Sequence, residues 1–297
     1  MKRAWLAAFF CLLQSSVFGG EIFRVAAYNV ENYVEDPASA RPIKSPQARA
    51  KVRESILALK PDVIALEEIG GSNELFELQS ALKAGGLDLP NWDYVQGHDT
   101  NIHVAVLSRF RITARHPHTN ETFLLDGRRM TVSRGFAEDE IQVNDKYKFT
   151  LMAAHLKSRR TSTIADEADW RLEEARILRR IIDARLAADP GCNLVVLGDF
   201  NDVKDSKPVR TLIGRGKNAL FDTRPAEQNG DTQSERRITW THYYGKEDDY
   251  SRIDYILLNH RMRSEWLEKE TRVLNLPDWG VASDHRPLVA GFVAEER

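Results

Sequence analysis

Short apolar segments that run directly into polar residues are the feature that most constrains how this chain can fold. In NLVVLGDFND, residues 193–202, four consecutive apolar residues are followed by a glycine and then by two acids and an amide. Such an apolar run is typical of a strand buried on both faces. A strand that ends in Asp199, Asn201 and Asp202 holds these polar groups on a rigid support, which is how catalytic sites in sheet proteins are commonly built.

The same arrangement recurs along the chain. Apolar segments end in, or contain, Asn29 (VAAYN), Glu67 and Glu68 (VIALEE), His155 (LMAAH), Asp254 (SRIDYILL) and Asp284 with His285 (ASDHRPL). Taken singly, such residues are usually turn formers or structural groups. Asp254 is the exception, because an acid between Ile253 and Tyr255 costs several kcal/mol to bury without a partner. Together the six segments predict a shared site at the ends of neighbouring strands.

Helices are expected between these strands. We predict strands over residues 22–28, 63–66, 104–107, 136–143, 147–154, 193–197, 253–258 and 288–293. A helix should begin at Ser45-Pro46 and end before Pro61, a second should be capped by Ser72, and the longest should cover residues 166–186. Strands that occur both singly and in adjacent pairs favour an α/β fold of the α+β type, with mixed sheets and helices outside. No Pro/Gly/Ser-rich linker interrupts the chain, so residues 20–297 are predicted to form one domain.

The first nineteen residues have the order of a secretory signal peptide. Lys2 and Arg3 precede an apolar stretch at residues 4–13, and Val17-Phe18-Gly19 offers small or aliphatic residues at the cleavage spacing. The stretch is too short to span a bilayer, and we find no later membrane span. The protein is therefore expected to be exported, either secreted or periplasmic. Cys192 is then the single remaining cysteine, so no internal disulfide forms and the hydrophobic core must supply the stability.

The net charge restricts how the protein can hold an anionic substrate. The formal charge of −2 becomes −4 when Lys2 and Arg3 are removed with the leader. Proteins that bind nucleic acid through general electrostatics have a strong basic excess, which is absent here. A polyanionic substrate would have to be held by local Arg, Lys or His groups, by bound cations, or by both.

The residue types indicate hard-cation chemistry. The candidate residues are mostly oxygen donors, and the chain has no CxxC, HExxH or His/Cys cluster, which argues against zinc. Carboxylates and an amide favour Mg²⁺, with Mn²⁺ or Ca²⁺ as alternatives. No GxxxxGK[ST] loop is present, so the metal does not serve a nucleoside triphosphatase of that type. A divalent cation beside two histidines suits hydrolysis of a phosphate ester.

Six motifs together resemble one known family. YNVEN, PDVIALEEI, HLKS, LGDFND, SRIDYIL and SDHRPL occur in the order found in the endonuclease/exonuclease/phosphatase superfamily, the DNase I-like fold, and they span residues 28–288. The resemblance implies a four-layer α/β/β/α sandwich in which two packed mixed sheets are flanked by helices.

The resemblance also implies roles for individual residues. Asn29, Glu68 and Asp284 match metal-side residues, with Glu68 rather than Glu67 in the ligand position. Asp199 matches the acid that aligns or deprotonates the attacking water. His285 matches the catalytic histidine, and Asp254 the acid that orients it. His155, Asn201 and Arg134 match groups that contact a phosphate oxygen, His155 being the second histidine of the DNase-type branch.

The resulting functional hypothesis is a secreted, metal-dependent phosphodiesterase, foremost a non-specific endonuclease acting on DNA. The disulfides of pancreatic-type DNases are absent, and Leu107 lies where abasic-site repair enzymes often carry a tyrosine. The alternative is a phosphoesterase for a small or lipid substrate, such as an inositol phosphate or sphingomyelin, and a lesser alternative is an inactive binding protein. The loops at residues 35–44, 116–129 and 226–237 would distinguish the first two. No obligate protein partner is evident, and we expect a monomer.

Overall fold

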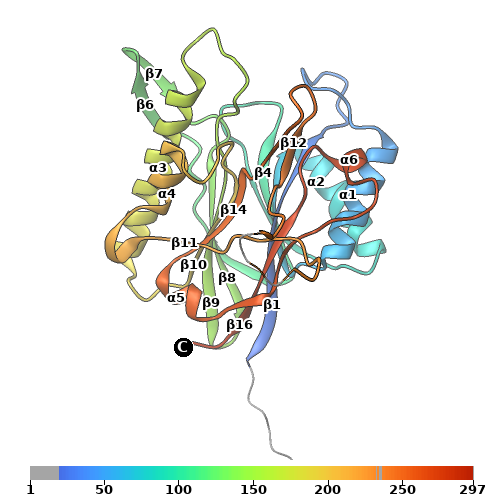
Figure 1. The fold of residues 1–297 in the computed structure, drawn as a ribbon, viewed down its shortest axis with the longest axis vertical. Helices are drawn as coiled ribbons and strands as arrows, with labels where there is room; N and C mark the ends of the chain where they lie inside the picture. Colours follow the sequence, from blue (N-terminus) through green and yellow to red (C-terminus); the bar gives the residue numbers. More distant parts are fainter. Residues whose placement is uncertain (1–19, 232, 234–235, 297) are drawn as a thin grey trace, which may run out of the picture.

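A computed structural model describes residues 20–231, 233 and 236–296 of the chain. The predicted signal peptide, residues 1–19, lies outside the described residues. Two six-stranded sheets form the centre of the molecule (Figure 1). The prediction of mixed sheets with helices outside is confirmed.

The first sheet contains parallel and antiparallel neighbours. Its strands lie in the order β15 (Trp266–Val273), β16 (Leu288–Ala294), β1 (Glu21–Tyr33), β2 (Val63–Ile69), β4 (His103–Ser108) and β3 (Asn91–Val95). Strands β1 and β2 are parallel, while β1 with β16 and β2 with β4 are antiparallel. The parallel pair brings the ends of the first two predicted strands to one edge of the sheet.

The second sheet has the same mixed character. Its strands lie in the order β11 (Phe221–Asp222), β14 (Asp254–Leu258), β10 (Leu194–Asp199), β9 (Tyr147–His155), β8 (Phe136–Asn144) and β5 (Arg111–Arg115). Strands β9 and β10 are parallel, and β8 pairs with β9 as an antiparallel hairpin. Two separate hairpins pair β6 (Thr122–Leu125) with β7 (Arg128–Thr131) and β12 (His242–Tyr244) with β13 (Asp249–Ser251).

Helices cover the outer faces of both sheets, which gives the four layers visible in Figure 1. The helices are α1 (Pro46–Leu59), α2 (Ser72–Ala84), α3 (Glu167–Ala188), α4 (Lys207–Ile213), α5 (His260–Ser264) and α6 (Trp279–Ala282), with a short 3₁₀ helix, η1 (Gly216–Asn218). Apolar side chains of α1 and α2 pack on the first sheet, and those of α3 and α4 pack on the second. In α1 the buried residues are Val52, Ser55, Ile56 and Leu59, whose spacing of three and four places them on one face of the helix.

A third core lies between the two sheets. Phe23 of β1 stacks on Phe149 of β9 with ring centroids 5.3 Å apart, and Phe292 of β16 lies 5.5 Å from Phe23. These rings join strands from opposite sheets and are buried. Face-to-face packing of this kind holds the two sheets at a fixed separation, so residues at their shared edge keep a fixed mutual position.

One of the two predicted helix caps is confirmed. Ser45 caps α1 through a side-chain bond to the backbone N–H of Ala48. The predicted cap at Ser72 is wrong, because Gly71 is the N-cap of α2 and Ser72 is already helical. Asp166, predicted as the start of the longest helix, is the N-cap of α3.

Cys192 is a free, buried cysteine in the described part of the chain. Across residues 20–231, 233 and 236–296, no helix combines the length and apolarity needed to cross a membrane.

Candidate active site

Three of the predicted site residues lie in one row across three adjacent strands. Asp199, the last residue of β10, is the register partner of His155 on β9 and of Asp254 on β14. The close approach of β10 to β9 requires Gly198, whose φ is +126° and whose added Cβ would lie 2.1 Å from the Ala154 carbonyl oxygen. Sheet register alone thus brings these three side chains together.

Asp254 and His285 form a buried pair. Nδ1 of His285 lies 2.9 Å from Oδ2 of Asp254, and because a carboxylate only accepts, the ring nitrogen is the donor. The Thr241 hydroxyl donates to the same Asp254 oxygen at 2.6 Å. Burial by itself lowers the pKa of His285, but the negative charges of Asp254 and Asp199 outweigh it and hold that pKa well above its ordinary value. The burial problem posed by Asp254 in the sequence is resolved by these two partners.

Asp199 lies at the centre of the site. Its Oδ2 accepts from the side-chain amide of Asn29 at 3.0 Å, and its Oδ1 accepts from the backbone N–H of Asn201 at 2.8 Å. Nε2 of His155 lies 3.5 Å away and Nε2 of His285 lies 3.7 Å away. Burial, followed by the charge of Asp254, raises the pKa of Asp199 to about 6. A carboxylate with a pKa near neutrality can accept a proton under physiological conditions.

Asn201 and Arg134 are fixed by a common acceptor. The Leu156 carbonyl oxygen accepts from Nδ2 of Asn201 at 3.0 Å and from Nη1 of Arg134 at 3.1 Å. Asn201 also donates to Oδ2 of Asp199 at 3.2 Å, so its amide positions that carboxylate in this arrangement. Both predicted phosphate-binding side chains therefore lie directly beside His155, the residue before Leu156. Burial, followed by the positive charge of Arg134, holds the pKa of His155 well below its ordinary value.

The predicted metal-side residues Asn29, Glu68 and Asp284 lie around Asp199 and its two histidine neighbours. Oε1 of Glu68 lies 3.9 Å from Nε2 of His155. Oε2 of Glu31 accepts from the backbone N–H of Asp284 at 3.2 Å. The Lys44 ammonium donates to the Glu31 carbonyl oxygen at 2.9 Å. Burial, followed by the charge of Asp284, raises the pKa of Glu31, which shows that these carboxylates are close enough to repel one another.

Glu67 and Glu68, adjacent acids of β2, have different environments. Glu67 is completely buried, and both of its carboxylate oxygens lack a hydrogen-bond partner among the described residues. Burial, followed by the charges of Asp254 and Asp199, raises its pKa well above the ordinary value. Glu68 instead accepts from the backbone N–H of Asn32 at 3.0 Å and remains partly accessible.

Left-handed backbone is concentrated at the site. Glu31, Asn32, Glu68 and Asn201 have φ values of 44°, 52°, 65° and 53°. Non-glycine residues in this region are uncommon and cost about 1 kcal/mol or more each, so the surrounding contacts must hold them there.

The donor set fits a hard divalent cation. Asn29, Glu68 and Asp284, with Glu31 beside them, supply amide and carboxylate oxygens, and Lys44 is the cation beside the three carboxylates. Mg²⁺, Mn²⁺ and Ca²⁺ prefer such oxygen ligands. Asp199, Asp254 and His285 also lie close enough to one another to hold an ion. Asp254 accepts from His285 and Thr241, and Asp199 accepts from Asn29 and Asn201, so we interpret these residues as catalytic groups rather than as metal ligands.

Sequence reasoning missed several residues that complete the site. The Ser283 hydroxyl donates to the Asn29 carbonyl oxygen at 2.8 Å and accepts from the His285 N–H at 3.0 Å, which ties the last motif to β1. His242 lies with its ring centroid 4.6 Å from that of His285. Thr241 and His242 lie in the WTHYY segment, which precedes the SRIDYIL motif. This Thr-His pair is the sequence feature from which the two residues could have been predicted as part of the site.

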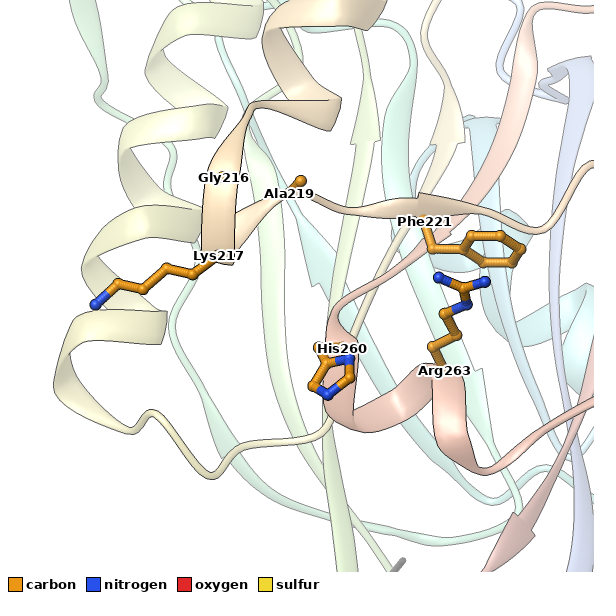
Figure 2. A pocket seen from close by; sticks show the side chains of 6 residues that line it. All are labelled: Gly216, Lys217, Ala219, Phe221, His260 and Arg263. Carbon is orange, nitrogen blue, oxygen red and sulfur yellow. The ribbon is translucent and has the colours of Figure 1, made fainter.

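Hollows in the described part of the chain also lie outside this cluster. One of about 360 Å³ is lined by Gly216, Lys217, Ala219, Phe221, His260 and Arg263 (Figure 2). It lies at the end of β14 opposite Asp254, and its Arg263 guanidinium lies 4.0 Å from the Phe221 ring centroid. A polar hollow of about 680 Å³ lies between the residue 34–39 loop, the start of α2 and residues 94–103. Neither contains Asp199, Asp254 or His285.

Comparison with known proteins agrees with this arrangement. Residues 26–285 match the model of the Endonuclease/Exonuclease/phosphatase family. A search of curated proteins finds no significant match.

Solved structures show the same fold at low sequence identity. The human Nocturnin catalytic domain, solved with a bound sulfate anion, has a TM-score of 0.65 and 16% identity, covering 92% of this chain and 95% of that one. Truncated Caenorhabditis elegans TDP2 has a TM-score of 0.62 and 16% identity, covering 92% and 98%. A family protein from Bacteroides thetaiotaomicron has a TM-score of 0.62 and 17% identity, covering 94% and 100%.

The family match covers most of the chain, and the site brings together the acids, amides and histidines of its motifs. Members of the family are metal-dependent hydrolases of phosphoester bonds. This chain therefore belongs to the endonuclease/exonuclease/phosphatase family.

Proposed function

We propose that the protein is an exported, Mg²⁺-dependent phosphodiesterase whose main substrate is DNA. The observation that carries the proposal is the chain from Asp254 through His285 to Asp199, with His155 on the other side of Asp199. This places two imidazoles and a carboxylate around one point, which is what in-line attack of water on a phosphorus centre requires.

Asp199 aligns the attacking water and accepts its proton. Its pKa, raised to about 6 by burial and the charge of Asp254, lies near the working pH at which a general base is most effective. Bonds from Asn29 and Asn201 hold the carboxylate in one orientation. A divalent cation held by Asn29, Glu68 and Asp284 would neutralise charge on the phosphoryl oxygens.

His285 stabilises the negative charge that develops on the phosphate. Asp254 accepts from Nδ1 and keeps the ring protonated, so Nε2 carries a second N–H toward the site. His155 and Arg134 bind the remaining phosphate oxygens from the opposite side. These donors are positioned before the reaction begins, so little reorganisation is needed in the transition state.

The choice of DNA rests on charge near the site. Arg134, Arg41 and Lys157 all lie close enough to His155 to act on its charge, although the protein as a whole is slightly acidic. A local group of cations beside a catalytic centre suits a substrate with several phosphates. Export follows from the predicted signal peptide at residues 1–19, and we propose that the monomer acts without a protein partner.

A substrate panel with defined metals tests the proposal. The purified protein should nick supercoiled plasmid and hydrolyse bis(p-nitrophenyl) phosphate in Mg²⁺, and EDTA should abolish both activities. Asp199→Asn retains the size of the side chain and should lose both. Inositol phosphates and sphingomyelin belong in the same panel. Faster turnover of either than of DNA would reject the nuclease hypothesis and support a phosphoesterase for a small or lipid substrate. Inactivity on every phosphoester in every metal would favour a binding protein.

A further inference from the structure

Two arginines from distant parts of the chain meet at one carboxylate oxygen beside the site. Nη2 of Arg41 lies 3.4 Å from Oδ2 of Asp99, and Nε of Arg134 lies 3.6 Å from the same atom. Arg134 is almost fully buried, whereas Arg41 and Asp99 retain about a fifth of their side-chain surface. One negative charge is shared by two positive charges, so the group keeps an excess positive charge.

Asp99 is fixed in place by backbone bonds to Ser133, the residue before Arg134, and to Asn101. Its N–H donates to the Ser133 carbonyl oxygen at 2.7 Å, and its Oδ1 accepts from the Asn101 N–H at 3.0 Å. Gly97 packs so closely on the Arg134 backbone that an added Cβ would lie 2.2 Å from its carbonyl carbon. The residue 97–101 loop therefore holds the carboxylate rigidly against Arg134.

The loop that carries Arg41 is hydrogen-bonded to the same residue 97–101 loop. Oδ1 of Asn101 accepts from the Ala40 N–H at 3.0 Å and from the Ser39 hydroxyl at 3.3 Å. These bonds place the Arg41 guanidinium next to Asp99 through neighbouring backbone. A long flexible side chain held in this way loses less entropy when it binds a ligand.

Both guanidiniums keep donors available. Arg134 uses Nη1 on the Leu156 carbonyl oxygen, and within the described residues its Nη2 has no protein acceptor. Arg41 makes a single side-chain contact there, the one to Asp99. Guanidinium donors suit the oxygens of a phosphate, which can accept two parallel bonds.

We propose that Arg41 and Arg134, joined through Asp99, form a second anion subsite that binds a phosphate next to the scissile one. The inference rests on the proposed function, because it assumes that Arg134 also borders the scissile phosphate. Nη1 of Arg134 is directed to Leu156 and to the row formed by His155, Asp199 and Asp254, which we call the catalytic row. Its Nε faces Asp99 and Arg41. Arg41 thus extends the positive surface away from the bond that is cut, where a substrate with two neighbouring phosphates would place its second group.

Binding without turnover tests the subsite directly. The probes are the dinucleotide TpT and its forms phosphorylated at the 5′ or 3′ end, titrated by calorimetry in EDTA. One of the two phosphorylated forms should bind about tenfold more tightly than TpT. Arg41→Ala should remove that preference, and Arg41→Lys should retain part of it because a single charge remains without the planar fork. Equal binding of all three probes, or an unchanged preference in Arg41→Ala, would overturn the inference.

Kinetics in Mg²⁺ provide the second measurement. The ratio of kcat/KM for the preferred phosphorylated dinucleotide to that for TpT should fall to about one in Arg41→Ala. Arg180→Ala is the matched control, since it removes an exposed arginine from α3 and should keep the ratio. A ratio in Arg41→Ala equal to that of the wild type contradicts the subsite.

The outcomes separate the two proposals. Loss of the binding preference in Arg41→Ala, with no hydrolysis of any phosphodiester by the wild type, would support the subsite and reject the nuclease. Hydrolysis of bis(p-nitrophenyl) phosphate with no effect of the second phosphate would support the phosphodiesterase and reject the subsite. This simple diester has no neighbouring phosphate, so it reports on the catalytic row alone.

Discussion

The His285 imidazole lies 2.9 Å from the Asp254 carboxylate, and the Thr241 hydroxyl bonds the same oxygen at 2.6 Å. The pair is buried, and its two residues come from segments separated by thirty-one positions. Asp254 consequently fixes both the orientation and the charge of the ring.

Asp254→Asn should lower kcat by about 10²- to 10⁴-fold, because an amide neither supports the imidazolium nor selects its tautomer. His285→Ala should lower kcat at least as much while the protein stays folded. Rates with bis(p-nitrophenyl) phosphate and far-ultraviolet circular dichroism measure the two effects. Turnover of Asp254→Asn at the wild-type rate would show that the pair is not part of catalysis.

Metal binding should be visible as stabilisation that depends on Glu68. Millimolar Mg²⁺ or Mn²⁺ should raise the Tm of the wild type, since a ligand that binds only the folded state stabilises it. Glu68→Ala should lose most of this increase. Glu54→Ala, which removes an exposed acid from α1, is the control and should keep it. An equal rise in Tm for wild type and Glu68→Ala would show that the metal binds at a site that does not include Glu68.

Gly198→Ala should destabilise the protein by about 2–4 kcal/mol, because the new Cβ would collide with the Ala154 carbonyl oxygen in a left-handed conformation. Gly127→Ala is the matched control: its φ is +74°, but no atom lies within 4 Å of the added Cβ. The control should cost about 1 kcal/mol. Urea denaturation gives both values, and similar losses in the two variants would show that close packing of β10 on β9 is unimportant.

Asp139 should make the stability dependent on pH. Burial, followed by the charge of Asp93, raises the pKa of Asp139 to about 8. Between about pH 4 and pH 8 the unfolded chain loses this proton while the folded protein keeps it, so the group's contribution to stability falls as the pH rises.

Asp139→Asn removes that dependence and should raise the Tm relative to wild type more at pH 8 than at pH 5. Asp145→Asn, in the exposed β8–β9 turn, should give the same small difference at both values. Thermal melts of the wild type and the two variants at pH 5 and pH 8 measure these differences in Tm. A stabilisation in Asp139→Asn that does not grow with pH would mean that Asp139 is ionised in the folded protein.

The sequence predicts most strongly what depends on strand register. His155, Asp199 and Asp254 each adjoin an apolar run, and pairing of β9, β10 and β14 brings them into one row without help from loops. The edge strand β3 was not predicted, because its short segment has no continuous apolar run. Strands β6 and β7 were not predicted, because they form a small separate hairpin.

Residues placed by loops could not be predicted in this way. Arg41 and Asp99 are fifty-eight positions apart and meet only because backbone bonds fasten their two loops together. Ser283 is recognisable as a site residue only once the last motif is seen to pack on Asn29. The predicted cap at Ser72 was wrong because Ser72 is already the first helical residue and Gly71, in extended backbone, is the N-cap.

The row formed by His155, Asp199 and Asp254 has a consequence for how such enzymes diversify. Since hydrogen bonds between strands fix these three side chains, segments such as residues 35–44 and 116–129 can change in length and composition without displacing them. Exchange of those segments with a homologue should therefore change which phosphoester the enzyme hydrolyses, while His155, Asp199 and Asp254 keep their positions.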